Sequence, residues 1–249
     1  MSKLTGKVVI VTGASKGIGA GIARAYGEAG ATVVVNYATS KEGADKIVAE
    51  IVSKGGKAIS VQADLSKAAD ISRLFAETKK AYGKLDVLVN NAAYYDFGPF
   101  DSVTAEGFHR HFDTNVLGPI LATQEAVKLF GEEGGSIVNI SSIVAIEPPP
   151  YTLVYSATKA AVDNITSTLS KELGPKKIRV NAILPGMTLT EGAARIGVAE
   201  SEMGASMLAR TPLGRHGQPE DIASVALFLG SPESKWITGE TIRVSGGLR

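Results

Sequence analysis

The sequence predicts one α/β domain over residues 1–249, with a mostly parallel seven-stranded sheet and helices on both of its faces. Short runs rich in β-branched residues alternate with longer segments of helical period, a pattern typical of parallel strands joined by crossover helices. Hydrophobic residues make up 44% of the 249 positions and charged residues 20%, which is enough apolar material for a large core. Because no repeat, low-complexity tract or linker interrupts the alternation, we expect a single doubly wound unit.

The first part of the chain predicts four strands and three helices. Residues 7–12 (KVVIVT) form the first strand. A helix follows over residues 17–29, where Ile18, Ile22 and Tyr26 recur at every fourth position. The elements after it are a strand at 32–36, a helix at 41–54, a strand at 58–62, a helix at 67–82 and a strand at 85–90.

The second part continues the alternation, with one long helix predicted over residues 104–130 and a strand over 136–140. Three prolines at 148–150 force an extended loop, because proline continues neither a helix nor a central strand. The remaining elements are a helix at 155–173, a strand at 178–184, an insertion at 185–215 with weak helical period, a helix at 219–230 and a strand at 241–244.

Charge and cysteine content exclude several classes of function. The 26 lysine and arginine residues against 25 aspartate and glutamate residues leave a formal charge of +1, so we expect no nucleic-acid or membrane partner. Without cysteine there are no disulfides, thiolate metal sites or cysteine nucleophiles. The pair His109 and His111 fits a solvated helix face better than a metal site, and we expect no metal. Without a visible secretory signal or a long apolar run, we expect a cytoplasmic protein.

A glycine-rich turn lies between the first strand and the first helix and reads TGASKGIG over residues 12–19. The missing side chains at Gly13, Gly17 and Gly19 let the backbone approach a ligand closely. Helix N–H groups and the positive end of the helix dipole favour a pyrophosphate there. An ordinary strand-to-helix turn also uses glycines, but the position after the first strand favours a Rossmann-like dinucleotide site.

Tyr155 and Lys159 are four residues apart in a predicted helix, so their side chains project from one face. A nearby ammonium lowers the pKa of a phenol from its usual ~10, which suits the phenol to proton transfer near neutral pH. Ser142, at the end of the fifth strand, is placed to stabilise charge that develops on a substrate oxygen, although its neighbour Ser141 competes for this role.

In these features the sequence resembles the short-chain dehydrogenase/reductase superfamily. The shared motifs follow the family's order along the whole chain: the Gly-x3-Gly-x-Gly turn, NNAA over residues 90–93, Ser142, YSATK over residues 155–159, and Pro185-Gly186. The chain departs from the family at Ala93, where members commonly have glycine, which affects the loop that carries Tyr94 and Tyr95.

The resemblance implies a role for each catalytic candidate. Tyr155 is the general acid in ketone reduction and the general base in alcohol oxidation, and Lys159 also binds the nicotinamide ribose. The family's spacing of thirteen residues before the tyrosine selects Ser142 over Ser141. Asn115 corresponds to the family's fourth catalytic residue, which holds a water in a proton relay to the lysine.

The end of the second strand favours NADP(H) as the cofactor. Residues 35–41 read VNYATSK and contain no carboxylate that would hold the ribose 2′-OH and repel a 2′-phosphate. Lys16 is placed to reach that phosphate, with Asn36, Thr39 and Ser40 as hydrogen-bond donors; a merely solvated Lys16 would leave an enzyme that uses both cofactors. Further cofactor neighbours implied by the resemblance are Ser15, Ile18, Tyr37, Asp64, Leu65, Asn91, Ala92, Pro185, Gly186, Thr188 and Thr190.

The substrate pocket is expected at the carboxyl ends of the strands. The insertion at about residues 187–215 resembles the family's substrate lid, and its methionines suit an adaptable surface. The expected lining residues are Tyr94, Tyr95, Phe97, Ile143, Tyr151, Met187, Met203 and Met207.

These features predict NADPH-dependent reduction of small or medium hydrophobic ketones, including aryl ketones or ketoesters, to secondary alcohols. The chain also resembles 3-oxoacyl-[acyl-carrier-protein] reductases and glucose 1-dehydrogenases. The former would need a basic rim, for which Lys128, Lys171, Lys176 and Lys177 are weak candidates. A non-catalytic nicotinamide-binding sensor or scaffold is a further alternative. Family members are mostly tetramers, so a homotetramer is expected.

Overall fold

The computed structural model describes residues 4–195 and 197–248, and the described residues form one sheet in the order β3-β2-β1-β4-β5-β6-β7. Every neighbouring pair of strands is parallel, which confirms the predicted fold class. The strands are β1 Val8–Val11, β2 Thr32–Tyr37, β3 Lys57–Gln62, β4 Val87–Asn90, β5 Gly135–Ile140, β6 Ile178–Pro185 and β7 Thr241–Val244.

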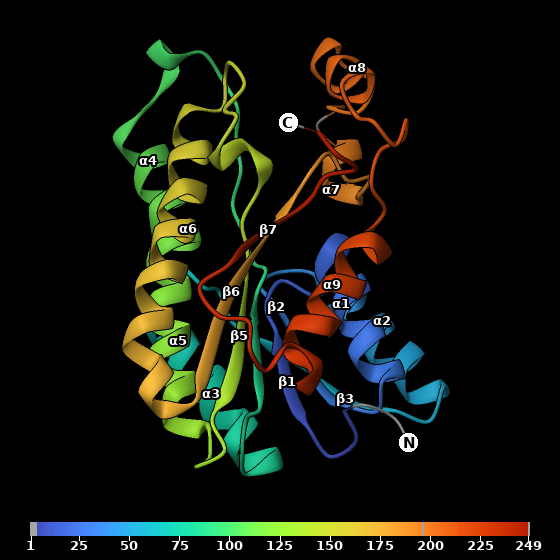
Figure 1. The fold of residues 1–249 in the computed structure, drawn as a ribbon, viewed down its shortest axis with the longest axis vertical. Helices are drawn as coiled ribbons and strands as arrows, with labels where there is room; N and C mark the ends of the chain where they lie inside the picture. Colours follow the sequence, from blue (N-terminus) through green and yellow to red (C-terminus); the bar gives the residue numbers. More distant parts are fainter. Residues whose placement is uncertain (1–3, 196, 249) are drawn as a thin grey trace.

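Helices cover both faces of the sheet (Figure 1). One face carries α1 Gly17–Glu28, α2 Lys41–Ser53 and α9 Pro219–Gly230, and the other carries α3 Ala68–Tyr82, α5 Gly118–Leu129 and α6 Leu153–Leu173.

Strand β1 shows why its sequence is apolar at every position. Val9 and Val11 belong to the core cluster on the side of α1 and α9, whereas Val8 and Ile10 belong to the cluster on the side of α3 and α5. A parallel strand that is buried on both faces needs hydrophobic residues throughout.

The sheet changes its winding direction at β1, because β2 and β4 lie on opposite sides of it. Loops that leave β1 and β4 therefore diverge and open a crevice at the carboxyl ends of the strands. Beyond this edge, near the top of Figure 1, lie the two short helices α7 Glu191–Arg195 and α8 Glu202–Ala209 of the predicted insertion. Residue 196 of that insertion is outside the described residues. A bridge between Thr188 and Gly217 joins the two ends of the insertion at its base.

The helix predicted over residues 104–130 is wrong as one continuous element. The structure has α4 Ala105–Phe112, one turn of π-helix at Asp113–Leu117, and then α5. The π turn accommodates one residue more than an α-helical turn, which a count of hydrophobic periodicity does not detect. Within the described residues, no helix has the length and apolar character that crossing a bilayer requires.

Candidate active site

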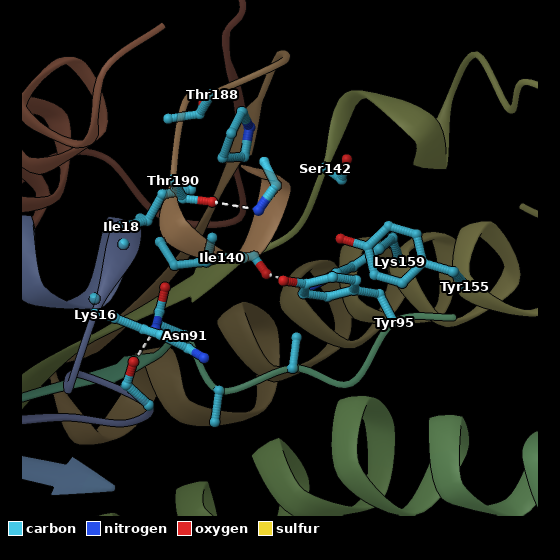
Figure 2. A pocket seen from close by; sticks show the side chains of 18 of the residues that line it. Lys16, Ile18, Asn91, Tyr95, Ile140, Ser142, Tyr155, Lys159, Thr188 and Thr190 are labelled. Carbon is cyan, nitrogen blue, oxygen red and sulfur yellow. Dashed lines mark hydrogen bonds between the residues drawn. The ribbon is translucent and has the colours of Figure 1, made fainter. Parts of the chain in front are cut away.

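A cavity of about 460 Å³ opens at the carboxyl ends of the strands (Figure 2). Its walls come from the glycine turn, the ends of β4, β5 and β6, the start of α6 and the insertion. In Figure 2, Lys16 and Ile18 lie at the left of this cavity, and Ser142 and Tyr155 lie at the right. The structure therefore brings the two predicted groups of residues, for cofactor and for catalysis, into one site.

The glycine turn is packed tightly against the end of β4. A Cβ atom at Gly13 would lie 2.8 Å from the Ala92 Cα, and Gly13 has a φ of +62°, which favours glycine. The Asn91 amide donates to the carbonyl oxygens of Thr12 at 2.8 Å and Gly13 at 3.1 Å. These contacts fix the turn in place beside the cavity.

Helix α1 starts at this turn in a way that fits an anionic group. Its first residue is Gly17, its first turn contains no acidic residue, and the side chain of Lys16 does not cap it. N–H groups at a helix start of this kind bind phosphates, and one of them, the Gly17 N–H, donates to the Glu191 carboxylate in this structure. The turn thus fits the pyrophosphate of a dinucleotide, as predicted.

The part of the cavity between Lys16 and the end of β2, where the adenosine ribose is expected, matches the prediction only in part. The exposed residues Lys16, Thr39 and Ser40 line the cavity. Asn36 lines the cavity as well, but its buried Nδ2 donates to the carbonyl oxygens of Val61 and Ala63 at 3.2 and 3.1 Å, so its expected donation to a 2′-phosphate stays a prediction.

Asn36 also supports the glycine turn, since its Oδ1 accepts a hydrogen bond from the Gly13 N–H at 3.1 Å. Tyr37, unlike Asn36, lies away from the cavity. It belongs to the buried core on the α1 face and does not line the cavity. The other residues predicted for the cofactor do line it: Gly13, Ser15, Gly17, Ile18, Gly19, Asp64, Leu65, Asn91, Ala92, Pro185, Gly186, Thr188 and Thr190.

Ser142, Tyr155 and Lys159 all line the cavity, the first from the end of β5 and the other two from α6. The Lys159 Nζ donates to the Ile140 carbonyl oxygen at 2.7 Å and lies 5.6 Å from the centre of the Tyr155 ring. The Ser141 hydroxyl is engaged, because it donates to the Lys159 carbonyl oxygen at 3.2 Å. The Ser142 Oγ accepts a long hydrogen bond of 3.4 Å from the Val144 N–H, which leaves its hydroxyl hydrogen for Tyr155 or a substrate oxygen.

The two titratable groups of this cluster have shifted pKa values. Desolvation raises the pKa of Tyr155, and a hydrogen bond with Ser142 acts in the opposite direction. Desolvation lowers the pKa of Lys159 to about 8, and the negative charge of Asp163, one helical turn further on, acts in the opposite direction. The predicted lowering of the Tyr155 pKa by Lys159 is not produced by the chain alone, where Tyr155 is a protonated phenol over a wide pH range.

The side chain of Asn115 does not reach this cluster. Asn115 lies in the π turn, where its Oδ1 accepts from the Tyr94 N–H at 2.7 Å and its Nδ2 donates to the Tyr94 carbonyl oxygen at 2.8 Å and to the Thr158 hydroxyl at 3.1 Å. These side-chain groups are therefore engaged and Asn115 does not line the cavity, so its role in holding a relay water stays a prediction. Its neighbour Thr114 lines the cavity, and no sequence signal pointed to it.

Two of the predicted substrate residues point elsewhere. The Tyr94 ring packs edge-on against His111 at 4.7 Å and carries the Arg110 guanidinium at 4.1 Å, outside the cavity. Tyr151 has a φ of +70°, is 61% exposed and is also absent from the cavity wall. Next to it, Thr152 does line the cavity, although no motif in the sequence pointed to this residue.

A largely apolar wall lies beside the Tyr155 ring. Tyr95 and Phe97 approach the Tyr155 ring edge-on, with ring centres 6.2 and 5.6 Å apart. A side chain at Gly192 would meet the Tyr95 hydroxyl, so the insertion lies directly on this wall. The predicted residues Ile143, Met187, Met203 and Met207 complete it.

Known proteins match this chain over nearly its full length. A family model described as enoyl-(acyl carrier protein) reductase matches residues 13–249. An uncharacterized oxidoreductase of Methylorubrum extorquens is 55% identical over 249 residues, which cover 100% of both chains. Versicolorin reductase 1 of Aspergillus parasiticus is 38% identical over 254 residues, which cover 98% of this chain and 97% of that protein.

A solved structure agrees with the sequence relatives. The angucycline C-6 ketoreductase LanV with bound NADP superposes with a TM-score of 0.92 at 37% identity, covering 99% of this chain and 97% of LanV. The fold, the order of the motifs and these matches lead to one conclusion. The chain belongs to the short-chain dehydrogenase/reductase family and is an oxidoreductase.

Proposed function

We propose that the protein uses NADPH to reduce hydrophobic ketones to secondary alcohols, in a reversible reaction. One observation carries the proposal: Ser142, Tyr155 and Lys159 line the same cavity as the glycine turn and lie beside an aromatic wall. A dinucleotide site, a proton donor and an apolar pocket are the three parts that ketone reduction by this chemistry needs.

The preference for NADPH over NADH rests on the charges around the ribose side of the cavity. No carboxylate follows β2 until Glu42, and the ammonium of Lys16 and the hydroxyls of Thr39 and Ser40 face the cavity. An added phosphate would meet a cation and two donors instead of a negative charge. The related LanV was crystallised with NADP, which supports this assignment.

The chain's own residues would act on the proton and on the substrate oxygen. When bound, the cofactor supplies the hydride. The Tyr155 hydroxyl donates a proton to the carbonyl oxygen, and the raised pKa keeps this group protonated before reduction. Ser142 donates a hydrogen bond to the same oxygen as its charge develops, and the Lys159 ammonium stabilises the phenolate that remains.

The surroundings of Tyr155 favour a hydrophobic, aromatic ketone. Tyr95 and Phe97 present ring edges around the phenol, and the methionines of the insertion adapt to varied shapes. Two relatives, versicolorin reductase 1 and the angucycline C-6 ketoreductase, are named as reductases.

An acyl carrier protein substrate receives less support. Lys171 lies twelve residues beyond Lys159 on α6, which places it about 18 Å further along the helix axis. Lys176 and Lys177 follow the end of α6, at the edge of the sheet where β6 begins. These lysines are thus far from the cavity entrance and do not form a basic rim around it.

A panel of aryl ketones, ketoesters, glucose and a 3-oxoacyl thioester tests the proposal. We expect NADPH oxidation, followed by its absorbance, to be fastest with the aryl ketones and to give one alcohol enantiomer in chiral analysis. Faster turnover of the thioester or glucose would favour those alternatives. No turnover of any substrate, combined with stoichiometric capture of a protein partner, would favour a sensor or scaffold.

The expectation of a cytoplasmic homotetramer built from single-domain subunits stays a prediction. The exposed surface beside α9 supports association, because the Trp236 side chain is 96% exposed there. Light scattering in solution should give a mass of four chains, and a monomer mass would contradict the tetramer.

A further inference from the structure

The insertion touches the glycine turn through one charged residue. The Gly17 N–H donates a hydrogen bond to the Glu191 Oε2 at 2.9 Å, although the two residues are 174 positions apart. Gly17 is the first residue of α1, and Glu191 is the first residue of α7. The contact therefore joins the start of the cofactor helix to the start of the first insertion helix.

Glu191 is not needed to cap its own helix. The Thr190 hydroxyl accepts a hydrogen bond from the Ala193 N–H at 3.0 Å, which is the usual capping contact at a helix start. The Glu191 carboxylate reaches across to α1 instead, where no acidic residue of α1 itself lies in the first turn. A carboxylate is stabilised there by the N–H group and by the positive end of the helix dipole.

The same position is the one proposed for the cofactor's pyrophosphate. A phosphate and a carboxylate both accept hydrogen bonds from N–H groups at a helix start, and both carry negative charge. The Gly17 N–H has one hydrogen, and two anions at this point would repel each other. Glu191 and a phosphate oxygen therefore compete for the Gly17 N–H at the start of α1.

We propose that Glu191 is an internal competitor for the pyrophosphate of the cofactor, and that its contact with Gly17 latches the insertion to α1 until the cofactor displaces it. The inference rests on the proposed use of a dinucleotide and adds a residue that sets its affinity. Binding then opens one contact of the insertion as it fills the turn, so cofactor entry and insertion movement are coupled.

The first test measures NADPH binding to the wild type and to Glu191→Gln and Glu191→Ala by fluorescence titration. We expect the Kd to fall about threefold to tenfold in both variants, because the competing charge is removed. Glu202→Gln is the matched control, since Glu202 lies in the first turn of α8 in the same insertion and should leave the Kd unchanged. An unchanged or higher Kd in both Glu191 variants would overturn the competition.

The second test needs no cofactor and measures tryptic cleavage within residues 191–210. We expect the ligand-free Glu191→Ala protein to be cut several times faster than the ligand-free wild type, because the latch is missing. Equal cleavage rates would overturn the latch. Failure of the wild type to bind NADPH at all would instead contradict the proposed function, and the cleavage rates would still decide whether the latch exists.

Discussion

The two sides of the cavity are built in different ways. On the side of the glycine turn, side-chain amides hold backbone groups: Asn36 holds Gly13, and Asn91 holds Thr12 and Gly13. On the side of Tyr155, aromatic rings and methionines pack by shape, with few hydrogen bonds between them. The first side presents fixed peptide groups to a ligand, whereas the second presents side chains that single substitutions can reshape.

The largest effect should come from Tyr155→Phe, which keeps the ring in the apolar wall and deletes the proton donor. We expect turnover to fall about a hundredfold or more, with NADPH affinity retained, because the glycine turn is untouched. Steady-state kinetics and a binding titration measure the two quantities.

Tyr94→Phe is the matched control for that substitution, since the Tyr94 ring packs against His111 outside the cavity. We expect its turnover to stay within twofold of the wild type. A comparable loss in both variants would mean that the loss in Tyr155→Phe is structural.

Lys159→Met should slow turnover and also stabilise the fold. Desolvation lowers the pKa of Lys159 from 10.5 to about 8. This shift means that the fold disfavours the charged form of Lys159 by about 3 kcal/mol. Loss of the hydrogen bond to the Ile140 carbonyl oxygen offsets about 1 kcal/mol of this. We expect the free energy of unfolding at pH 7 to rise by about 1 to 3 kcal/mol.

The stability difference between Lys159→Met and the wild type should change with pH in a definite direction. The pKa of Lys159 is lower in the folded chain than in the unfolded chain. Between pH 8 and 10.5 the unfolded chain therefore binds more protons at this site. The free energy of unfolding of the wild type should thus rise relative to that of Lys159→Met as the pH rises through this range. As the pH approaches 10.5 the cost of the buried charge disappears, and the wild type should become the more stable protein by about the 1 kcal/mol of its hydrogen bond to the Ile140 carbonyl oxygen. Urea unfolding at pH 7, 9 and 10.5 measures this difference, and a variant less stable than the wild type at pH 7 would contradict the account.

Lys16→Ala should have the smallest effect and act on only one cofactor. We expect the KM for NADPH to rise about fivefold to tenfold, since one charged contact to a phosphate is lost. The KM for NADH should not change, because that cofactor has no 2′-phosphate. A wild-type kcat/KM for NADH equal to that for NADPH would contradict the proposed preference.

The sequence predicts the position of a site residue well where a helix or a strand determines which way its side chain points. Tyr155 and Lys159 are one helical turn apart, and the glycine turn joins a strand to a helix, so periodicity alone brings them to the same edge of the sheet. The fold class follows from the same alternation of strands and helices.

The errors concern residues whose direction periodicity does not fix. Tyr94 and Tyr95 are adjacent in an extended loop, where neighbouring side chains point to opposite sides, and the sequence does not say which one faces the cavity. Tyr151 leaves the expected wall because its backbone has a positive φ. Asn36 has the polar side chain of a ligand donor, but its bonds to two backbone segments, the glycine turn and residues 61–63, become visible only in the folded chain.

Because of the π turn at Asp113–Leu117, the structure of this segment depends more on its number of residues than on which residues they are. The π turn holds one residue more than an α-helical turn, so deletion of one residue here would remove the wide turn and join α4 and α5 in one regular α-helix. Asn115 would then leave the backbone of Tyr94, and the loop that carries Tyr95 and Phe97 would lose its anchor. Single-residue deletions in this short segment should therefore be tolerated far less than substitutions at its exposed positions.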